Sequence, residues 1–292
     1  MTAPTGLSEL EVWEAFRSLR LEGQGLFPSM ISHLLSRKAL GPPGPTLEIG
    51  AGDAELWRQG GGAFVDSVLA AGPLHLTDAD PALVARLRAM PLVQRPGVTV
   101  DHADVMALPF PASKFARVLA MHVLHWCGTP SNVEQAVQAL ARSLLPNGVA
   151  FIVTVDEQVH MVELYRLLGA ARAALIRRGV ACPAMPPTSP RVLPFCAGNA
   201  PSFLSAAFAR IQRFDWRYAH LVDQFHPALR VPSETFLVGY VRTLPFVREA
   251  VASGQLPEEF FDEVATLFLD EIGRGSFFRM SRCDVLYECR VA

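Results

Sequence analysis

The sequence predicts an α/β protein built on a doubly wound, mostly parallel sheet. Short apolar runs typical of strands alternate with helix-length segments between Thr46 and Asp156. Strands that are separated by a helix pair in parallel through right-handed crossovers. The 292 residues are 50% hydrophobic and only 18% charged, a composition that fits a compact enzyme-like protein and excludes a disordered chain.

Charge and cysteine usage exclude several classes of partner and ligand. A formal net charge of -2 gives no attraction to nucleic acid or anionic membranes, so we expect neither as a partner. No apolar run approaches the roughly 18 residues that span a bilayer. The five scattered cysteines form no CxxC pair, which argues against a disulfide framework or a zinc site and favours the reducing cytoplasm. The only lysines are Lys38 and Lys114, a bias typical of high-GC bacterial genomes.

The elements follow in a regular order up to Asp156. Apolar residues at helical spacing predict two N-terminal helices, and the proline-rich segment 41–45 ends the second. Strand-like runs then alternate with helical patterns. The predicted elements are helices at 7–21 and 27–40, then strand 46–50, helix 55–71, strand 74–78, helix 81–90, strands 97–104 and 115–124, helix 132–145 and strand 148–156.

This alternation stops after Asp156. A helix is expected at 159–178, and the proline-rich stretch 181–201 predicts no regular structure. A strand at 208–221 and a helical block at 233–273 follow, and 276–291 predicts either a strand hairpin or one long strand. We therefore divide the chain into an N-terminal helical cap (1–40), a core (41–156), a cap insertion (157–200), a core continuation (201–221), a helical cap insertion (222–274) and a C-terminal core strand (275–292).

A glycine-containing loop follows the first strand of the core. Gly50 and Gly52 let the backbone turn tightly and approach a ligand at the carboxyl edge of the sheet. A dinucleotide motif would need glycine or alanine at position 55, where Glu55 stands, so NAD and FAD are disfavoured. No GK[ST] follows either, which argues against a phosphate-binding loop.

The segment Glu48-x-Gly50-x-Gly52, with Ala54 in place of a third glycine, resembles the first motif of the class I S-adenosylmethionine-dependent methyltransferases. Later segments resemble the family's next four motifs in the family's order. They are LHLTD, ending at Asp78; the run ending at Asp104; FARVLAMHVLHW; and LLPNGVAFIVTV, where Asn147 replaces a glycine. The resemblance covers 46–155 and is strongest to the small-molecule branch that includes the ubiquinone and menaquinone biosynthesis enzymes. It implies a Rossmann-like methyltransferase fold with a seven-stranded sheet, and helical caps over the methyl donor.

The resemblance also implies the cofactor, S-adenosyl-L-methionine, and a set of residues that bind it. Asp78 would bind the ribose hydroxyls, for which Asp80 is a competing choice, and Asp104 would face the adenine amino group. The complete predicted set is Glu48, Gly50, Ala51, Gly52, Asp78, Ala79, Asp104, Val105 and Met121. The implied function is methylation, at oxygen or carbon, of a small apolar or aromatic biosynthetic intermediate. The alternatives are a fold relative that catalyses another reaction, such as a cyclisation, and a non-catalytic scaffold.

Histidines supply the candidate general bases, because the ordinary imidazole pKa suits proton transfer near neutral pH. His122 and His125 follow the fourth strand of the motif series, beside the expected methyl position; the alternative is that one packs on the cofactor or caps a helix. A metal site at His220, Asp223 and His226 is disfavoured against surface polar residues, and we predict no metal.

The acceptor site would draw on residues outside the core. Arg17 and Arg20 are candidates for binding an anionic group, or are simply exposed on a helix. Aromatic residues of the caps either line an acceptor pocket or join the caps to the core, and the oligomeric state, including a homodimer, is left open. These aromatic residues are Phe27, Phe195, Phe203, Phe225, Phe236, Tyr240 and Phe246.

Overall fold

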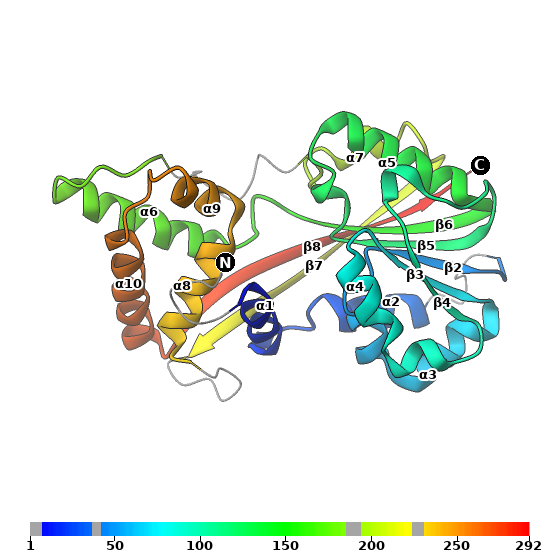
Figure 1. The fold of residues 1–292 in the computed structure, drawn as a ribbon, viewed down its shortest axis with the longest axis horizontal. Helices are drawn as coiled ribbons and strands as arrows, with labels where there is room; N and C mark the ends of the chain where they lie inside the picture. Colours follow the sequence, from blue (N-terminus) through cyan, green and yellow to red (C-terminus); the bar gives the residue numbers. More distant parts are fainter. Residues whose placement is uncertain (1–7, 37–41, 185–193, 224–230, 292) are drawn as a thin grey trace. The chain divides into compact units, whose positions relative to one another are not determined.

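The computed structural model describes residues 8–36, 42–184, 194–223 and 231–291. These residues form a mixed α/β fold around one eight-stranded sheet of order β1-β7-β8-β6-β5-β2-β3-β4 (Figure 1). The predicted α/β class with a mostly parallel central sheet is confirmed, whereas the expected count of seven strands was one too low. The additional strand, β1 (Arg20–Glu22), is a fully exposed three-residue edge strand that pairs antiparallel with β7.

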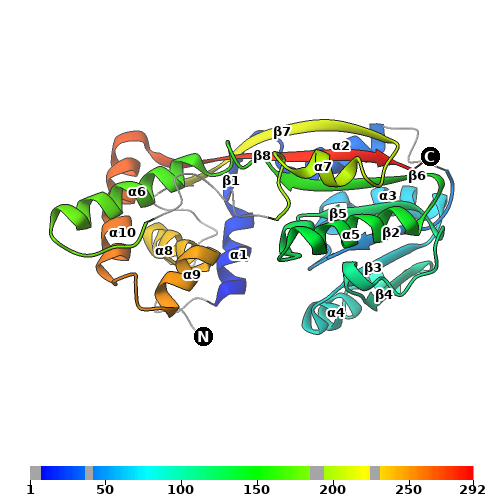
Figure 2. The same cartoon turned by 90° about the horizontal axis from the view of Figure 1, so that it is seen from above.

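The other strands lie close to their predicted positions. β2 pairs in parallel with β3 and β5, β3 with β4, and β5 with β6, while β6 and β8 are antiparallel. The C-terminal segment is one long strand, not a hairpin, and is the neighbour of β7 in the sheet (Figure 2). The bounds are β2 Thr46–Ile49, β3 Leu74–Asp78, β4 Val98–His102, β5 Phe115–Met121, β6 Leu144–Val155, β7 Arg210–Asp223 and β8 Phe277–Arg290.

Several helices begin where a polar side chain satisfies the free backbone N–H groups of the first turn. Ser8 caps α1 together with Glu11, Asp80 caps α4 and Thr129 caps α5. The helices are α1 Glu9–Ser18, α2 Leu26–Ser36, α3 Glu55–Ala71, α4 Pro81–Arg88, α5 Pro130–Ser143, α6 Val162–Arg177, α7 Ala200–Leu204, α8 Ser233–Thr243, α9 Pro245–Ala252 and α10 Glu259–Gly275, with short 3-10 turns η1 (Pro91–Gln94), η2 (Val105–Ala107) and η3 (Leu124–Trp126).

The chain reverses its direction of travel across the sheet between β2 and β5. From β2 it proceeds outward through β3 to β4, and it then returns to place β5 on the opposite side of β2, followed by β6. Helices α2 and α3 lie on one side of the sheet and α5 and α7 on the other (Figure 1). In such sheets ligands bind outside the carboxyl ends of the strands at the reversal, which here is the end of β2 and β5.

The chain divides into two compact units. Unit 1 comprises residues 1–23, 158–190 and 218–282, and unit 2 comprises 24–157, 191–217 and 283–292. Unit 1 has its own apolar core around α6, α8 and α10, whereas unit 2 contains the parallel strands. The cap and core boundaries expected from the sequence stay a prediction, because compactness alone does not show which segment covers a ligand.

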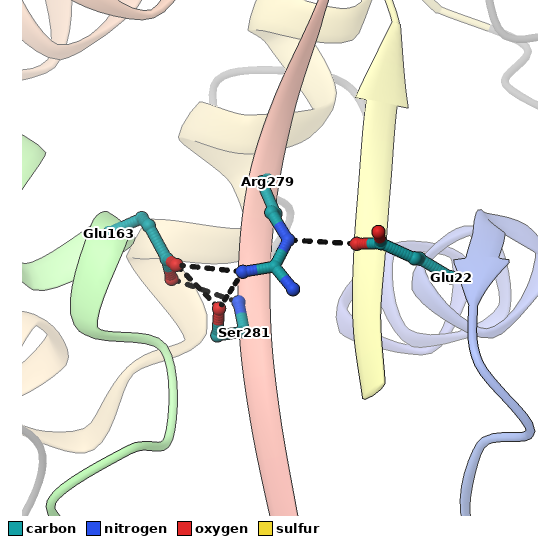
Figure 3. Close-up of polar contacts among 4 residues, drawn as sticks. All are labelled: Glu22, Glu163, Arg279 and Ser281. Atoms are coloured by element: carbon teal, nitrogen blue, oxygen red, sulfur yellow. Dashed lines mark hydrogen bonds and ion pairs between the residues drawn. The ribbon is translucent and has the colours of Figure 1, made fainter. Parts of the chain in front are cut away.

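A polar network within unit 1 fixes the start of α6 to β8 (Figure 3). The Glu163 carboxylate in the first turn of α6 accepts hydrogen bonds from the Ser281 N–H, at 2.9 Å, and from the Ser281 hydroxyl. Arg279 donates to the Ser281 hydroxyl at 2.8 Å and to the Glu22 carboxylate of β1, also at 2.8 Å. The Arg279–Glu22 ion pair is half exposed and adds little stability, whereas the part-buried bonds of Glu163 anchor the helix.

Candidate functional site

Acidic side chains gather at the carboxyl edge of unit 2, where three neighbouring parallel strands end. Glu48 lies in β2, Asp78 is the last residue of β3, and Asp104 follows β4. The Ala103 N–H donates to the Asp78 carbonyl at 3.0 Å, which extends the β3–β4 pairing to the residue before Asp104. The carboxyl edge of the sheet therefore has one acid at or near the end of each of the strands β2, β3 and β4.

The glycine loop after β2 is held in left-handed backbone conformations. Gly50 and Gly52 have φ of 63° and 57°, in the region that favours glycine. A Cβ on Gly50 would lie 2.6 Å from Cγ2 of Val123, but one on Gly52 would meet no heavy atom within 4 Å. Gly50 therefore packs tightly against the segment after β5, while Gly52 faces open space into which a ligand can approach the backbone.

Ala54 stands where the motif that the sequence resembles has a third glycine. Its φ of 56° and ψ of 36° are left-handed, and the residue is fully buried as the N-cap residue of α3. For an L-residue this conformation costs about 1 kcal/mol of conformational energy, which is small compared with the energy gained by packing α3. The replacement of glycine by alanine is therefore compatible with the loop geometry of the motif.

Asp78 joins the glycine loop to the start of α4. Its Oδ2 accepts from the Gly52 N–H at 3.0 Å and its Oδ1 from the Asp80 N–H at 2.9 Å. Each carboxylate oxygen keeps a second lone pair for a ligand hydroxyl. Asp80, the competing choice, accepts from the Ala82 N–H at 2.8 Å as the N-cap residue of α4, so its carboxylate serves the helix.

Glu48 is a buried acid behind the loop. It is 2% exposed, and its Oε2 accepts a hydrogen bond from Trp57 Nε1 at 2.5 Å. The Glu48 pKa is raised from 4.5 to about 8, chiefly by burial; the Trp57 hydrogen bond lowers it, and the charges of Asp78 and Asp53 contribute to the rise. Glu48 is therefore mostly a neutral carboxylic acid at pH 7. Trp57 was not predicted as a site residue, since a tryptophan in a helix is ordinarily an apolar core residue.

The other predicted cofactor residues lie along the same edge. Asp104 is part-buried and accepts from the Met106 N–H at 2.9 Å as the N-cap residue of η2. Ala51 and Val105 are buried, while Ala79 is exposed. Met121, the last residue of β5, is part-exposed. The structure thus brings the predicted set together at the ends of β2 to β5.

His122 and His125 lie directly after β5, with ring centroids 6.0 Å apart. His122 has a left-handed φ of 54°, and its N–H donates to the Val153 carbonyl at 3.0 Å. Its Nε2 lies 3.2 Å from Oδ1 of Asp284 in β8, whose side chain has no exposed surface. Sequence reasoning missed Asp284. The available signal was its position as a single acid between Cys283 and the apolar run Val285–Tyr287, within a predicted strand.

The remaining described candidate residues belong to unit 1. His220 is buried in unit 1 with its ring 4.1 Å from that of Phe16, and Asp223 is in the same unit. His226 lies outside the described residues. Within the described ranges, no group of three His, Cys, Asp or Glu residues could hold a metal ion. Arg17 and Arg20 are exposed residues of unit 1.

The aromatic residues proposed for an acceptor pocket divide between the units. Phe236 and Tyr240 are buried in the core of unit 1, where the Tyr240 hydroxyl contacts Met161 Sδ at 3.2 Å. Phe246 packs near Tyr165 in the same unit. Phe27, Phe195 and Phe203 belong to unit 2, and Phe225 lies outside the described residues.

A search of family models found one that matches this chain. Residues 59–152 match the family described as a methyltransferase domain, a segment that begins just after the glycine loop. No curated protein matches the chain. The part of the chain that the structure describes has no helix of the length and apolarity that crossing a bilayer requires.

Similar solved structures come from several bacteria. The YcgJ protein of Bacillus subtilis is 14% identical, with a TM-score of 0.51 over 90% of this chain and 98% of that one. A candidate methyltransferase from Bacillus halodurans C-125 is 13% identical over 90% and 98%, with a TM-score of 0.49. The N-methyltransferase NodS of Bradyrhizobium japonicum WM9, solved with S-adenosyl-L-homocysteine, is 13% identical over 90% and 87%, with a TM-score of 0.45.

The first of these likenesses shows a shared fold, and the family match covers residues 59–152 of the chain's 292. The strand order, the reversal between β2 and β5 and the acids at their carboxyl edge agree with both. The chain therefore combines the fold of the YcgJ protein with a segment, residues 59–152, that matches a methyltransferase domain.

Proposed function

We propose that this chain transfers the methyl group of S-adenosylmethionine to a small-molecule acceptor, at oxygen or carbon. The observation that carries the proposal is the hydrogen bond from the Gly52 N–H to the Asp78 carboxylate, at the carboxyl edge of the sheet where the chain reverses. It places an approachable backbone segment and a carboxylate side by side where open α/β sheets bind their ligands.

The residues at this edge fit the chemical groups of the donor. The free lone pairs of the Asp78 carboxylate suit the two hydroxyls of a ribose, and a second acid, Asp104, suits an adenine amino group. The open space at Gly52 lets the polar amino acid portion approach backbone groups. Glu48, Ala51, Ala79, Val105 and Met121 would complete the walls. No cluster of positive charge is required, because this donor carries no phosphate.

S-adenosylmethionine, when bound, would supply a methyl group on a positively charged sulfur; as the acceptor's electron pair bonds to the methyl carbon, the carbon–sulfur bond breaks and the sulfur becomes a neutral thioether. The chain's own residues would hold the acceptor in line, which lowers the barrier by several kcal/mol through proximity. For a hydroxyl or acidic carbon, His122 or His125 would take up the acceptor proton. Trp126, 67% exposed next to His125, offers an aromatic face that favours a flat, apolar acceptor.

Thermal unfolding with added ligands tests the proposal. A ligand that binds only the folded chain stabilises it by about 2.7 kcal/mol at a hundredfold excess over its Kd. S-adenosylmethionine and S-adenosylhomocysteine should each raise the Tm, and NAD should not. Asp78→Asn should remove most of the rise, whereas the matched variant Asp80→Ala should retain it, because Asp80 caps α4. A rise with NAD alone, or none in protein free of copurified ligand, would contradict the proposal.

Product analysis then separates methylation from other chemistry. The chain is incubated with labelled S-adenosylmethionine and a panel of phenolic and isoprenoid acceptors, and products are analysed by mass spectrometry. A product that gains one methyl group, with an equal amount of S-adenosylhomocysteine, supports transfer. A product isomeric with its substrate, formed without consumption of the donor, would instead indicate a cyclisation.

A further inference from the structure

We propose that Asp284 orients the His122 imidazole so that Nδ1 is the atom that takes the proton from the methyl acceptor. The inference rests on the proposed function and deepens it. It selects one of two candidate histidines, names the reacting nitrogen, and assigns a positioning role to an acid at the far end of the sequence. His122, His125 and Asp284 all belong to unit 2, and the geometry among them is internal to that unit.

The contact between the two side chains is short and sheltered. Nε2 of His122 lies 3.2 Å from Oδ1 of Asp284, and the Asp284 side chain is 0% exposed while that of His122 is 21% exposed. A buried carboxylate beside one ring nitrogen favours the tautomer that carries its proton on that nitrogen. With the proton on Nε2, the lone pair is on Nδ1, so Nδ1 is the basic atom of the ring.

Backbone pairing fixes the relative positions of these two residues. The His122 N–H donates to the Val153 carbonyl of β6, and β6 pairs with β8 in a register that sets Val155 opposite Asp284. The Asp156 N–H donates to the Cys283 carbonyl at 2.9 Å, which extends that pairing. The distance between imidazole and carboxylate is therefore set by three adjacent strands and does not depend on a loop.

The backbone of His122 is left-handed, with a φ of 54°. Among residues with a Cβ, asparagine, aspartate and histidine are the ones enriched in this region. Histidine therefore fits this position, which follows the end of β5 beside the expected donor edge.

His125 is the other titratable group that faces His122. Its ring lies 6.0 Å from that of His122 and 4.9 Å from that of Trp126. The Asp284 carboxyl oxygen lies 3.2 Å from Nε2 of His122, and this contact is what singles out His122 as the proposed base.

The proton transfer balances without a further reactant. As the acceptor oxygen bonds to the transferred methyl, its O–H bond breaks and the proton passes to Nδ1 of His122. The ring then carries protons on both nitrogens, with Nε2 lying 3.2 Å from the Asp284 carboxyl oxygen. After the product leaves, Nδ1 returns its proton to water.

Nitrogen NMR of histidine tests the tautomer without knowledge of the acceptor. Long-range 1H–15N spectra of the full chain with 15N-labelled histidine distinguish a protonated ring nitrogen from an unprotonated one. The His122 signals are assigned by their loss in His122→Asn, because asparagine tolerates the left-handed backbone. Neutral His122 should carry its proton on Nε2 in the unmodified chain, and Asp284→Asn should shift it to a mixture of tautomers.

Glu288→Gln is the matched control. Glu288 is a second buried acid of β8, but its Oε2 lies 3.4 Å from Nε2 of His33, so this variant should leave the His122 tautomer unchanged. A proton on Nδ1 of His122 in the unmodified chain overturns the proposal, even if Asp284→Asn fails to fold. An unchanged His122 tautomer in folded Asp284→Asn overturns it as well.

Binding and kinetics separate this inference from the proposed function. Calorimetric titration with S-adenosylhomocysteine should give the same affinity for Asp284→Asn and the unmodified chain. Absence of binding to both would remove the proposed function, whatever the tautomer. With a hydroxyl acceptor from the product screen, Asp284→Asn should lower kcat at least tenfold and leave the acceptor KM unchanged, whereas a loss confined to KM would show that Asp284 only shapes the site.

Discussion

Replacing Glu48 by glutamine should flatten the dependence of stability on pH. Glu48 is almost completely buried, and its pKa of about 8 lies well above the ordinary value of 4.5. Between these two values the folded chain retains a proton that the unfolded chain has released. The free energy of unfolding therefore falls as the pH rises across this window, and the contribution becomes constant above the folded-state pKa.

The magnitude follows from the two pKa values. Each unit of difference corresponds to about 1.4 kcal/mol, so Glu48 should reduce the free energy of unfolding by roughly 3 kcal/mol between pH 5 and pH 8. Glutamine carries no titrating proton and still offers a carbonyl oxygen to Trp57 Nε1. Other groups titrate equally in both proteins, so the difference between the two pH profiles isolates Glu48.

Urea unfolding at several pH values provides the measurement. The unmodified chain, Glu48→Gln and the control Glu134→Gln, at an exposed position of α5, are compared from about pH 5 to pH 8. The gap between the unmodified chain and Glu48→Gln should widen by roughly 3 kcal/mol toward high pH, while the control should run parallel to the unmodified chain. Parallel profiles for all three proteins would refute the assignment of a raised pKa to Glu48.

Further predictions concern the loop, a helix cap and unit 1. Gly50→Ala should lower the free energy of unfolding, because its Cβ would lie 2.6 Å from Cγ2 of Val123, whereas Gly52→Ala, whose Cβ meets no protein atom, should keep the fold at a strain of about 1 kcal/mol but weaken S-adenosylhomocysteine binding at least tenfold by calorimetry, because its methyl group would occupy the space through which the ligand approaches the backbone; unchanged binding by Gly52→Ala would argue against that approach. Asp80→Ala should lower stability by about 1 kcal/mol through loss of the α4 cap, without changing affinity for the same ligand. Glu163→Ala should destabilise the chain by about 1 to 3 kcal/mol, because the part-buried Ser281 N–H and hydroxyl lose their acceptor, and ligand affinity should remain unchanged; a change in affinity would count against a purely structural role.

Local patterns predicted the core elements well because each is defined by its own residues. Helix α3 has the predicted bounds, Glu55–Ala71, since a glycine loop precedes it and Gly72 ends it. β1 was not predicted, because its three exposed residues have no strand pattern and pair with residues about two hundred positions later. The sequence also left open whether 276–291 forms a hairpin or one strand, because the answer depends on the tertiary partner. In the structure this segment pairs with β6 as one strand.

The candidate site shows the same division between local and distant information. The glycines and the acids at 48, 78 and 104 stand at the ends of recognisable strands, so the sequence locates them at one edge. The Trp57 bond to Glu48 and the contact of Asp284 with His122 depend on side-chain direction and on strand order. Neither of these two contacts is marked by a repeat or a characteristic spacing in the sequence, because the groups come together only in the folded chain.

The antiparallel pairing of β6 with β8 has a consequence for synthesis on the ribosome. β6 is a twelve-residue, largely buried strand, and Val155 at its end pairs with Asp284, about 130 residues later in the chain. At 5–20 residues per second, the β6 edge stays without its partner for on the order of ten seconds. An apolar strand with an open edge recruits other strands, so nascent chains are at risk of aggregation in this interval. Slower translation or chaperone depletion should therefore reduce the yield of folded protein before it affects the activity of the molecules that do fold.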